Sequence, residues 1–151
     1  MPEERPTVRV IKALTSEQKE AGFVVRRTVF VGEQQVPPEL EFDRFEQESI
    51  HFIGVDSMGK TCGAARWRKT RLGVKLERFA VLASHRRQGI GAALLNAILN
   101  DIHADPNART ERIYLNAQID AVPFYDKFGF QPCGEEFVEA DIVHQQMERL
   151  R

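Results

Sequence analysis

The sequence KLERFAVLASHRRQGIGAALLNAILNDIHA, residues 75–104, contains the stretch that decides the fold. Residues 75–82 form an apolar segment typical of a strand, and a short turn leads into a helical segment whose first turn carries Gly89 and Gly91. The first N–H groups of a helix have no partner within the helix and lie at the positive end of its dipole, so they can bind an anion. Glycine lets the main chain approach such a ligand closely. The stretch therefore predicts a phosphate-binding turn between a strand and a helix.

The spacing of the glycines separates this turn from two familiar phosphate loops. A Walker loop requires Gly, four residues and then Gly-Lys-Ser/Thr, and no such run is present. A dinucleotide fingerprint requires a third small residue at the position that Leu94 occupies. What remains is Arg/Gln-x-x-Gly-x-Gly/Ala, met by Arg86, Gly89 and Gly91. This order resembles the acetyl-CoA pyrophosphate loop of the GNAT superfamily of N-acetyltransferases, and the alternative is that the glycines only open a surface helix.

The resemblance implies a fold and a set of cofactor contacts. The fold is of the α/β class, with a mixed, mostly antiparallel central sheet, flanking helices, and fourth and fifth strands that splay apart. The pantetheine arm would insert there and bond to the main chain of Phe79, Ala80 and Val81, whose amides could also stabilise an oxyanion. Asn116, at the end of the fifth strand, would bond the cofactor amides, or would only satisfy the strand end. The residues expected at the pyrophosphate are Arg86, Arg87, Gln88, Gly89, Ile90, Gly91 and Ala92.

A second informative stretch is AVPFYDKFGF, residues 121–130. It resembles the acceptor-proximal motif of the same superfamily, in which a helix presents a tyrosine to the cofactor sulfur. A thiol with a pKa near 8.5 and a phenol with a pKa near 10 are close enough for Tyr125 to protonate the departing thiolate. Phe124 is expected to contact the cofactor. The alternative is that these aromatic residues are simply one face of a core helix.

Two residues are candidates for the general base. His144 lies in EEFVEADIVHQQM, residues 135–147, which resembles the C-terminal segment of glyphosate-acetyltransferase, YjcF-like and ElaA-like members, including their His-x-x-Met spacing. A histidine with a pKa near 6.5 suits removal of a proton from an ammonium group at neutral pH. Glu77 lies two residues before Phe79, where many relatives carry a carboxylate that activates amines through water. It could equally pair with neighbouring basic strand residues, so both candidates stay open.

Upstream, RRTVFVGEQQVP, residues 26–37, is similar to the Arg-x-x-x-Phe-x-x-Glu-Gln segment of ElaA-like proteins, so the resemblance extends from Arg26 to Met147. The segment from Gly32 to Glu48 is rich in carboxylates and forms either a solvated loop or a segment over an active site that receives a cationic amine. Basic residues gather at Arg66, Arg68, Lys69, Arg71, Lys75 and Arg78. They form either a solvated strand face or a surface that attracts a polyanionic cofactor. The charge of the acceptor therefore stays open.

Length and composition limit the class of protein. A chain of 151 residues with 42% hydrophobic and 28% charged residues predicts a single domain, residues 1–151, around one core. A net charge of −1 argues against a nucleic-acid-binding protein. Cys62 and Cys133 are far apart and lack metal-ligand spacing, which predicts free thiols and no metal site. The absence of a long apolar run and of a signal-peptide pattern at residues 1–6 predicts a soluble cytoplasmic protein with no membrane partner.

Hydrophobic periodicity predicts the remaining elements. Strands are expected at 7–14, 50–56, 61–70, 75–82, 113–117, 132–138 and 142–150, and helices at 15–31, from Gly89 to Ala104, and at 121–128. The sequence as a whole predicts an acetyl-CoA-dependent N-acetyltransferase that acts on a small-molecule amine by direct transfer in a ternary complex. A non-catalytic acyl-CoA-binding module and a nucleotide-binding regulator are the alternatives. Dimers are common in the superfamily, and a homodimer is the expected partner state if one forms.

Overall fold

A mixed sheet carries the fold, and the computed structural model describes residues 8–149 of the chain. The strands within this range are β1 (Arg9–Lys12), β2 (Ile50–Val55), β3 (Thr61–Thr70), β4 (Gly73–Val81), β5 (Ile113–Gln118), β6 (Phe130–Pro132), β7 (Phe137–Glu139) and β8 (Ile142–Arg149). Their order across the sheet is β1-β2-β3-β4-β5-β8-β6, and β7 also pairs with β8. Thr7 and Leu150, the predicted ends of the first and last strands, and residues 1–6 lie outside the described residues.

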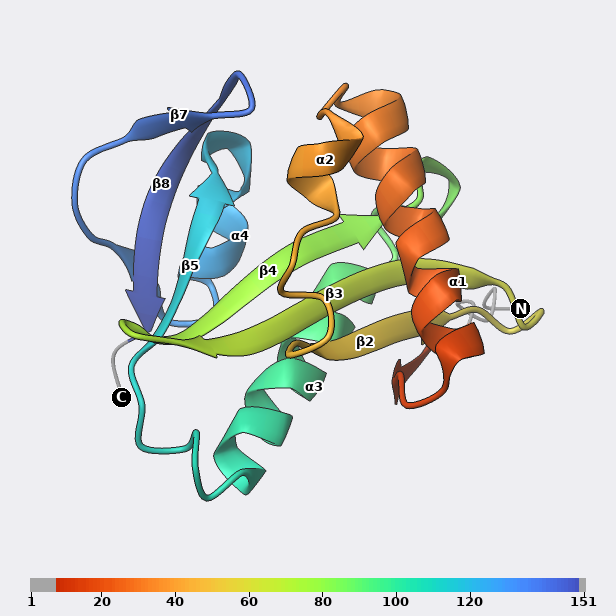
Figure 1. Cartoon of the computed structure of the whole chain (residues 1–151), viewed down its shortest axis with the longest axis horizontal. Coiled ribbons are helices and arrows are strands. Elements are labelled where there is room, and N and C mark those ends of the chain that lie inside the picture. The colour runs from red at the N-terminus through yellow and green to blue at the C-terminus, as the bar shows by residue number, and fades with distance from the viewer. Residues whose placement is uncertain (1–7, 150–151) are drawn as a thin grey trace, which may run out of the picture.

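The β4–β5 pair is parallel, whereas the other pairs described are antiparallel. It is also short, because its register runs only from Val74 and Ile113 to Leu76 and Leu115. Beyond that point β4 continues to Val81 and β5 to Gln118 without pairing with each other, and Figure 1 shows the two strands diverging. This opening confirms the predicted splay of the fourth and fifth strands.

A β-bulge in β4 lies at the start of the opening. Ala64 and Arg66 of β3 face Ala80 and Glu77, so β4 holds one extra residue within this interval. Arg78, inside the interval, has a left-handed φ of 62°. A bulge bends its strand and increases the local twist, which turns the end of β4 away from β5.

Helices cover both faces of the sheet (Figure 1). They are α1 (Ser16–Arg26), the π-helix η1 (Arg27–Glu33), α2 (Pro38–Glu41), the short 3₁₀ turn η2 (Ala83–His85), α3 (Ile90–Ala104), a second 3₁₀ turn η3 (Ile119–Ala121) and α4 (Val122–Asp126). The buried stripe on α3 consists of Ile90, Leu94, Leu95, Ile98, Leu99 and Ile102. This stripe is the one that the sequence periodicity predicts, and it packs into the larger of the hydrophobic cores.

Alternation along β3 assigns its side chains to two cores. Ala65 packs in the core that contains α3, whereas Ala64 packs with Val25 and Phe30, which belong to α1 and η1. Since successive strand residues point to opposite faces, α1 and α3 lie on opposite sides of the sheet. The α1 side of the sheet and the glycine turn at the start of α3 therefore lie on opposite faces.

Local signals account for the start of α1. The Thr15 hydroxyl accepts a hydrogen bond from the Gln18 amide at 3.1 Å, and the Gln18 side chain accepts one from the Thr15 amide at 3.1 Å. This arrangement is the capping box that the sequence predicts. The helix was expected to continue to residue 31 in α geometry, but it changes to π geometry after Arg26.

The predicted strand at 132–138 is wrong. Two short strands, β6 and β7, flank a break at residues 133–136, where Gly134 has a φ of 77°. The Gln145 side chain donates hydrogen bonds to the carbonyl groups of Cys133 at 3.2 Å and Gly134 at 3.1 Å. These bonds satisfy carbonyl groups that a continuous ladder with β8 would otherwise have satisfied, so the sheet tolerates the interruption.

Candidate active site

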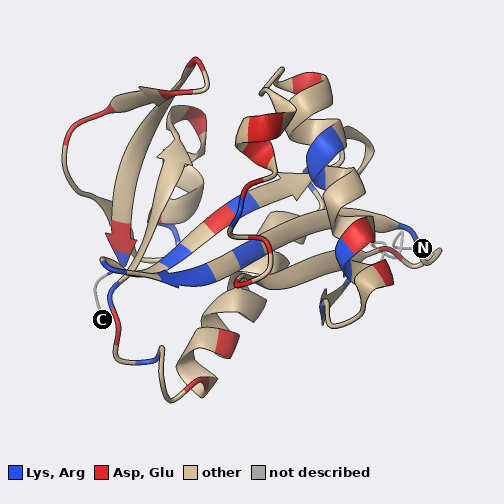
Figure 2. Ribbon diagram, viewed as in Figure 1, with Lys and Arg blue, Asp and Glu red and all other residues tan. Residues whose placement is uncertain are grey.

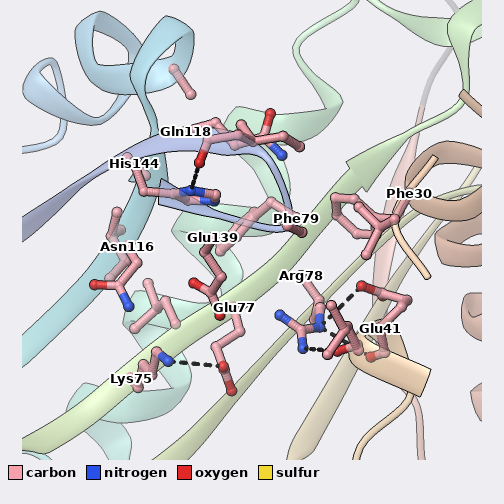
Figure 3. Close-up of a pocket in the computed structure, with 18 of the residues that line it drawn as sticks. Phe30, Glu41, Lys75, Glu77, Arg78, Phe79, Asn116, Gln118, Glu139 and His144 are labelled. Atoms are coloured by element: carbon pink, nitrogen blue, oxygen red, sulfur yellow. Dashed lines mark hydrogen bonds and ion pairs between the residues drawn. The ribbon is translucent and has the colours of Figure 1, made fainter. Parts of the chain in front are cut away.

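A pocket of about 400 Å³ lies where β4 and β5 separate, with the segment around α2 along one side. Figure 3 shows residues that line it. Of the residues that the sequence proposes, the structure brings these into the pocket lining: Glu77, Phe79, Asn116, Tyr125 and His144. The glycine turn, Ala80, Val81 and Phe124 lie outside this lining.

Tyr125 lies on α4 with its ring packed edge-on against Phe79 at 6.0 Å, Phe124 at 5.1 Å and Phe130 at 6.0 Å between centroids. The side chain is buried but reaches the pocket. Within residues 8–149 its hydroxyl group has no hydrogen-bond partner. Burial raises the pKa of Tyr125, so the phenol stays protonated at neutral pH, and the same shift makes it a weaker acid towards a thiolate than an ordinary phenol.

His144 lies on β8, opposite Gln118 of β5. Its ring stacks on Phe137, with 5.6 Å between ring centroids and planes 19° apart. Its Nδ1 lies 2.7 Å from the Ile142 carbonyl oxygen, which can only accept, so Nδ1 carries the proton. The neutral ring then has its lone pair on Nε2. The contact therefore selects the tautomer in which Nε2 can act as a base.

Glu77 is held by three cations. Its carboxylate lies 3.0 Å from Arg66, 2.6 Å from Arg68 and 3.2 Å from Lys75. Burial by itself would raise the pKa of this carboxyl group, but the surrounding cations, Arg66 foremost, lower it to about 2. A carboxylate with so low a pKa is a weak proton acceptor, and the sequence alternative of pairing with basic strand residues describes its contacts in the structure.

The glycine turn precedes α3, whose N-cap is Gly89 with a left-handed φ of 80°. A Cβ at Gly89 would contact nothing within 4 Å, so the backbone angle, not space, favours glycine there. Arg86 donates hydrogen bonds to the Val81 carbonyl at 3.0 Å and to Glu33 at 2.8 Å. A Cβ at Gly91 would meet the Phe124 ring at 3.6 Å, so the turn adjoins α4, which also carries Tyr125.

The main-chain groups at the end of β4 have two kinds of partner, strand β3 and the side chain of Arg86. Ala80 pairs with Ala64 of β3, and its side chain is buried in the core that α1 covers. The Val81 carbonyl instead accepts from Arg86. On the facing strand β5, the side-chain oxygen Oδ1 of Asn116 accepts a hydrogen bond from the Gln146 side chain at 3.2 Å. Asn116 also lines the pocket. Asn116 therefore has both a structural partner and a free donor in the pocket.

Buried arginine–carboxylate pairs support the side of the pocket that Leu40, Glu41 and Asp43 line, and the sequence analysis did not predict them. Arg26 and Arg66 are 1% and 0% exposed. Arg26 contacts Glu41 at 2.8 Å and Glu46 at 2.7 Å. Arg66 contacts Asp43 at 2.9 Å, as well as Glu46 and Glu77. Figure 2 shows the acidic residues after α1 facing the basic bands of β3 and β4.

The acidic segment is therefore only partly a solvated loop, because Glu39 and Glu48 are exposed whereas Glu41, Asp43 and Glu46 are held in ion pairs. Glu41 is 3% exposed and Arg78 lies 3.2 Å from it. Burial raises the pKa of Glu41, although Arg78 and Arg26 oppose that shift. The segment does lie beside the pocket, through Leu40, Glu41 and Asp43. One signal in the sequence was available, since Arg66 interrupts a run of small and aromatic residues that is otherwise typical of a buried strand.

Two glutamines also line the pocket and were not among the predicted site residues. Gln34 and Gln118 exchange reciprocal side-chain hydrogen bonds of 3.3 and 2.8 Å. The pair joins the end of η1 to the end of β5, which are 84 residues apart in sequence.

Among the described residues, no helix has the length and apolar character needed to cross a membrane. No group of histidine, cysteine, aspartate and glutamate side chains within residues 8–149 is arranged to hold a metal ion.

The parallel strand pair that separates, with a helix that begins at a glycine beside it, is the arrangement of an acyltransferase-type fold. The comparisons agree, because a family model described as an acetyltransferase (GNAT) domain matches residues 12–151. YjcF of Bacillus subtilis, an uncharacterized N-acetyltransferase, is 44% identical over 141 residues, which are 93% of this chain and 98% of YjcF. The chain therefore belongs to the GNAT acetyltransferase family and is an acetyltransferase.

Solved structures show the same fold. ElaA of Escherichia coli superimposes with a TM-score of 0.81 and 26% identity, covering 96% of this chain and 99% of ElaA. An acyl-CoA N-acyltransferase of Pseudomonas aeruginosa gives a TM-score of 0.81 at 24% identity, with 96% and 99% coverage. These matches confirm the fold, and ElaA together with YjcF agrees with the ElaA-like and YjcF-like resemblance of the sequence motifs.

Proposed function

We propose that the protein transfers the acetyl group of acetyl-CoA to the nitrogen of a small-molecule amine by direct attack in a ternary complex. The observation that carries this proposal is the parting of β4 and β5 after Leu76 and Leu115. The opening has the glycine turn at the end of β4 and Tyr125 and His144 in the pocket beside it. An extended cofactor arm could bind between the strands while its phosphates bind the turn.

The residues present fit such a cofactor. The first amides of α3, at residues 90–92, have no partner within the helix, and Gly89 is left-handed where the chain enters it. The Val81 carbonyl and the Asn116 amide group could bond the arm, and Phe124 would flank it. Arg86 would exchange Glu33 for a phosphate group. Acetyl-CoA, when bound, supplies the thioester that is cleaved.

The two proton-transfer roles follow from the pocket chemistry. His144 would accept a proton from the acceptor ammonium at Nε2, leaving a neutral amine whose nitrogen forms the new C–N bond. Tyr125 would donate its proton to the thiolate that the broken C–S bond leaves, and the second proton that the nitrogen loses as the tetrahedral intermediate collapses would restore the phenol. Glu77, the alternative base, serves better as the anion that holds Arg66, Arg68 and Lys75 in place.

The pH dependence of kcat in the His144→Gln variant tests whether His144 or Glu77 is the base. We expect kcat at pH 7 to fall by about 100-fold, the lower end for loss of a general base. The deficit should shrink as the pH approaches the pKa of the amine, because a growing fraction of the acceptor arrives without its proton. Glu77→Gln should show no such recovery, and a pH-independent deficit in His144→Gln would remove His144 as the base. Rates would be measured by thiol release across pH.

Calorimetric titration with acetyl-CoA, CoA and ATP tests the cofactor assignment. Wild-type protein should bind both CoA species and not ATP. Gly89→Val should weaken acetyl-CoA binding by about tenfold, because a side chain in a left-handed conformation costs 1 to 3 kcal/mol and displaces the turn. Gly134→Val is the matched control, since Gly134 has a φ of 77° and equally open surroundings but lies between β6 and β7.

Three outcomes would contradict parts of the proposal. Equal loss of affinity in both glycine variants would assign the effect to general strain. Preference for ATP would favour a nucleotide-binding protein. Binding of CoA without acetylation of any amine in a broad panel would favour a non-catalytic acyl-CoA-binding module. The cytoplasmic location and the homodimer stay predictions from the sequence.

A further inference from the structure

The charged groups that line the pocket are nearly all paired with one another. Arg68 and Lys75 contact Glu77, and Arg78 contacts Glu41 and Asp43. The cations behind them, Arg26 and Arg66, are likewise occupied. An anionic acceptor would have to displace one of these carboxylates and lose its ion pairs. The paired network therefore offers little to an anion, although its cations outnumber its carboxylates.

Glu139 is the exception. It lines the pocket, and within residues 8–149 no cation or hydrogen-bond donor contacts its carboxylate. Figure 3 draws its side chain in the cavity together with His144 and Glu77. The sequence motifs do not single it out, because it differs in no local respect from the other carboxylates of the same segment.

The β7–β8 hairpin positions Glu139 on the same face as His144. Phe137 is opposite His144, and Glu139 is opposite Ile142. Because alternate strand residues share a face, all four side chains belong to one side of the hairpin, where Phe137 stacks on His144. Diagonal neighbours on such a face lie about 7 to 8 Å apart. One amine nitrogen could therefore lie between the carboxylate and the imidazole ring.

The turn that joins these strands is tightly defined. Ala140 and Asp141 have φ values of 52° and 62°. Two successive left-handed residues are the signature of a type I′ hairpin turn, which fixes the register of its strands. Ala140 itself lines the pocket. The carboxylate thus stands at the end of a strand whose register with β8 is set.

From this geometry we infer that Glu139 binds the reacting amine of the acceptor as its ammonium form and selects cationic acceptors over anionic ones. This inference rests on the proposed function and names its substrate class. Glu139 attracts and orients the ammonium group, and His144 then removes one proton before attack. Aliphatic amines that are protonated at neutral pH and carry no anionic group are the acceptors that this site fits.

The test uses three amines of matched length that differ in the charge at the far end: butylamine, 1,4-diaminobutane and 4-aminobutanoate. Wild-type protein should use the two cationic amines more efficiently than the amino acid. In Glu139→Gln, KM for butylamine should rise by about 2- to 5-fold, the range for an exposed ion pair. The kcat value and the KM for acetyl-CoA should stay within about twofold.

Two variants serve as controls. Glu139→Asp keeps the charge and should recover part of the lost affinity. Glu136→Gln removes a carboxylate from the same exposed segment outside the pocket and should leave KM unchanged. An equal effect in Glu136→Gln would assign the change to the long-range field, and a wild-type preference for 4-aminobutanoate would overturn the inference.

Binding of the amines without turnover distinguishes this inference from the proposed function. NMR line broadening of the amine methylene protons reports binding to the protein in the presence of CoA. Butylamine binding that Glu139→Gln abolishes, without acetylation in the wild type, would support the Glu139 assignment and contradict the transferase mechanism. Acetylation and binding that both survive Glu139→Gln would support the mechanism and overturn the assignment. Absence of butylamine binding to the wild type would also overturn it.

Discussion

Replacement of Tyr125 by phenylalanine is expected to lower kcat by about 100- to 1,000-fold, within the range for loss of a general acid. The reason is that the hydroxyl group of this buried side chain is the only part removed, while its ring contacts with Phe79, Phe124 and Phe130 remain. Cofactor affinity should change little, because the predicted pyrophosphate contacts belong to residues 86–92. Steady-state rates and calorimetric titration with CoA measure the two effects separately.

Tyr114 provides the matched control, since it is the other tyrosine of the chain. Its hydroxyl group pairs with that of Thr70 at 2.6 Å, and it does not line the proposed active-site pocket. Tyr114→Phe should therefore keep its turnover and lose about 1 kcal/mol of unfolding free energy with that hydrogen bond. Tyr125→Phe should lose little stability, because its hydroxyl group has no partner within residues 8–149. Unchanged turnover in Tyr125→Phe would remove this residue from the mechanism.

Replacement of Arg66 by methionine is expected to lower the free energy of unfolding by about 3 to 5 kcal/mol. The substitution leaves the carboxylates of Asp43, Glu46 and Glu77 without the cation that they share. Chemical denaturation followed by circular dichroism measures the loss. Arg71→Met, in an exposed turn, should change the unfolding free energy by less than about 0.5 kcal/mol. A similar small change in Arg66→Met would mean that the network is not a source of stability.

The same network predicts the dependence of stability on pH. The pKa of Glu77 is about 2 in the folded protein, below the ordinary value of 4.5, so its contribution is fully present above pH 4.5. That contribution is lost as the pH falls from 4.5 towards 2. In Arg66→Met the pKa of Glu77 should move back towards its ordinary value. The acid-induced loss of stability in this window should therefore be smaller in the variant than in the wild type, which unfolding curves at pH 7, 4.5 and 3 would test.

Much of the site follows from patterns that are local in sequence. The order of Arg86, Gly89 and Gly91 is confined to one turn, so its resemblance to a family loop was visible without coordinates. His144 and Tyr125 were named from similarly short motifs, and both line the pocket. The strand at 61–70 and the apolar stripe of α3 were predicted because their periods reflect a single element. The break in the strand predicted at 132–138 was not foreseen, because the carbonyl groups of Cys133 and Gly134 are satisfied by the side chain of Gln145, which belongs to β8.

The choice between the two candidate bases illustrates what local patterns leave open. Glu77 and His144 were equally acceptable as residue types. Their difference lies in neighbours that are distant along the chain, since Arg66 is 11 residues from Glu77 and still lowers its pKa. The absence of a partner for Glu139 among the described residues is likewise a property of the assembled pocket.

The sequence by itself determined the family, the glycine turn and the elements of the sheet, because these depend on residues within one strand, turn or helix. Only the tertiary structure decided that the acidic segment is neutralised by Arg26, Arg66 and Arg78. The splay of β4 and β5 was implied by the family resemblance, but only the folded chain shows which of the predicted residues line the pocket beside it. The physical reason is that electrostatic energies depend on distance and burial. Neither quantity exists for a pair of residues until the chain has folded and brought them together.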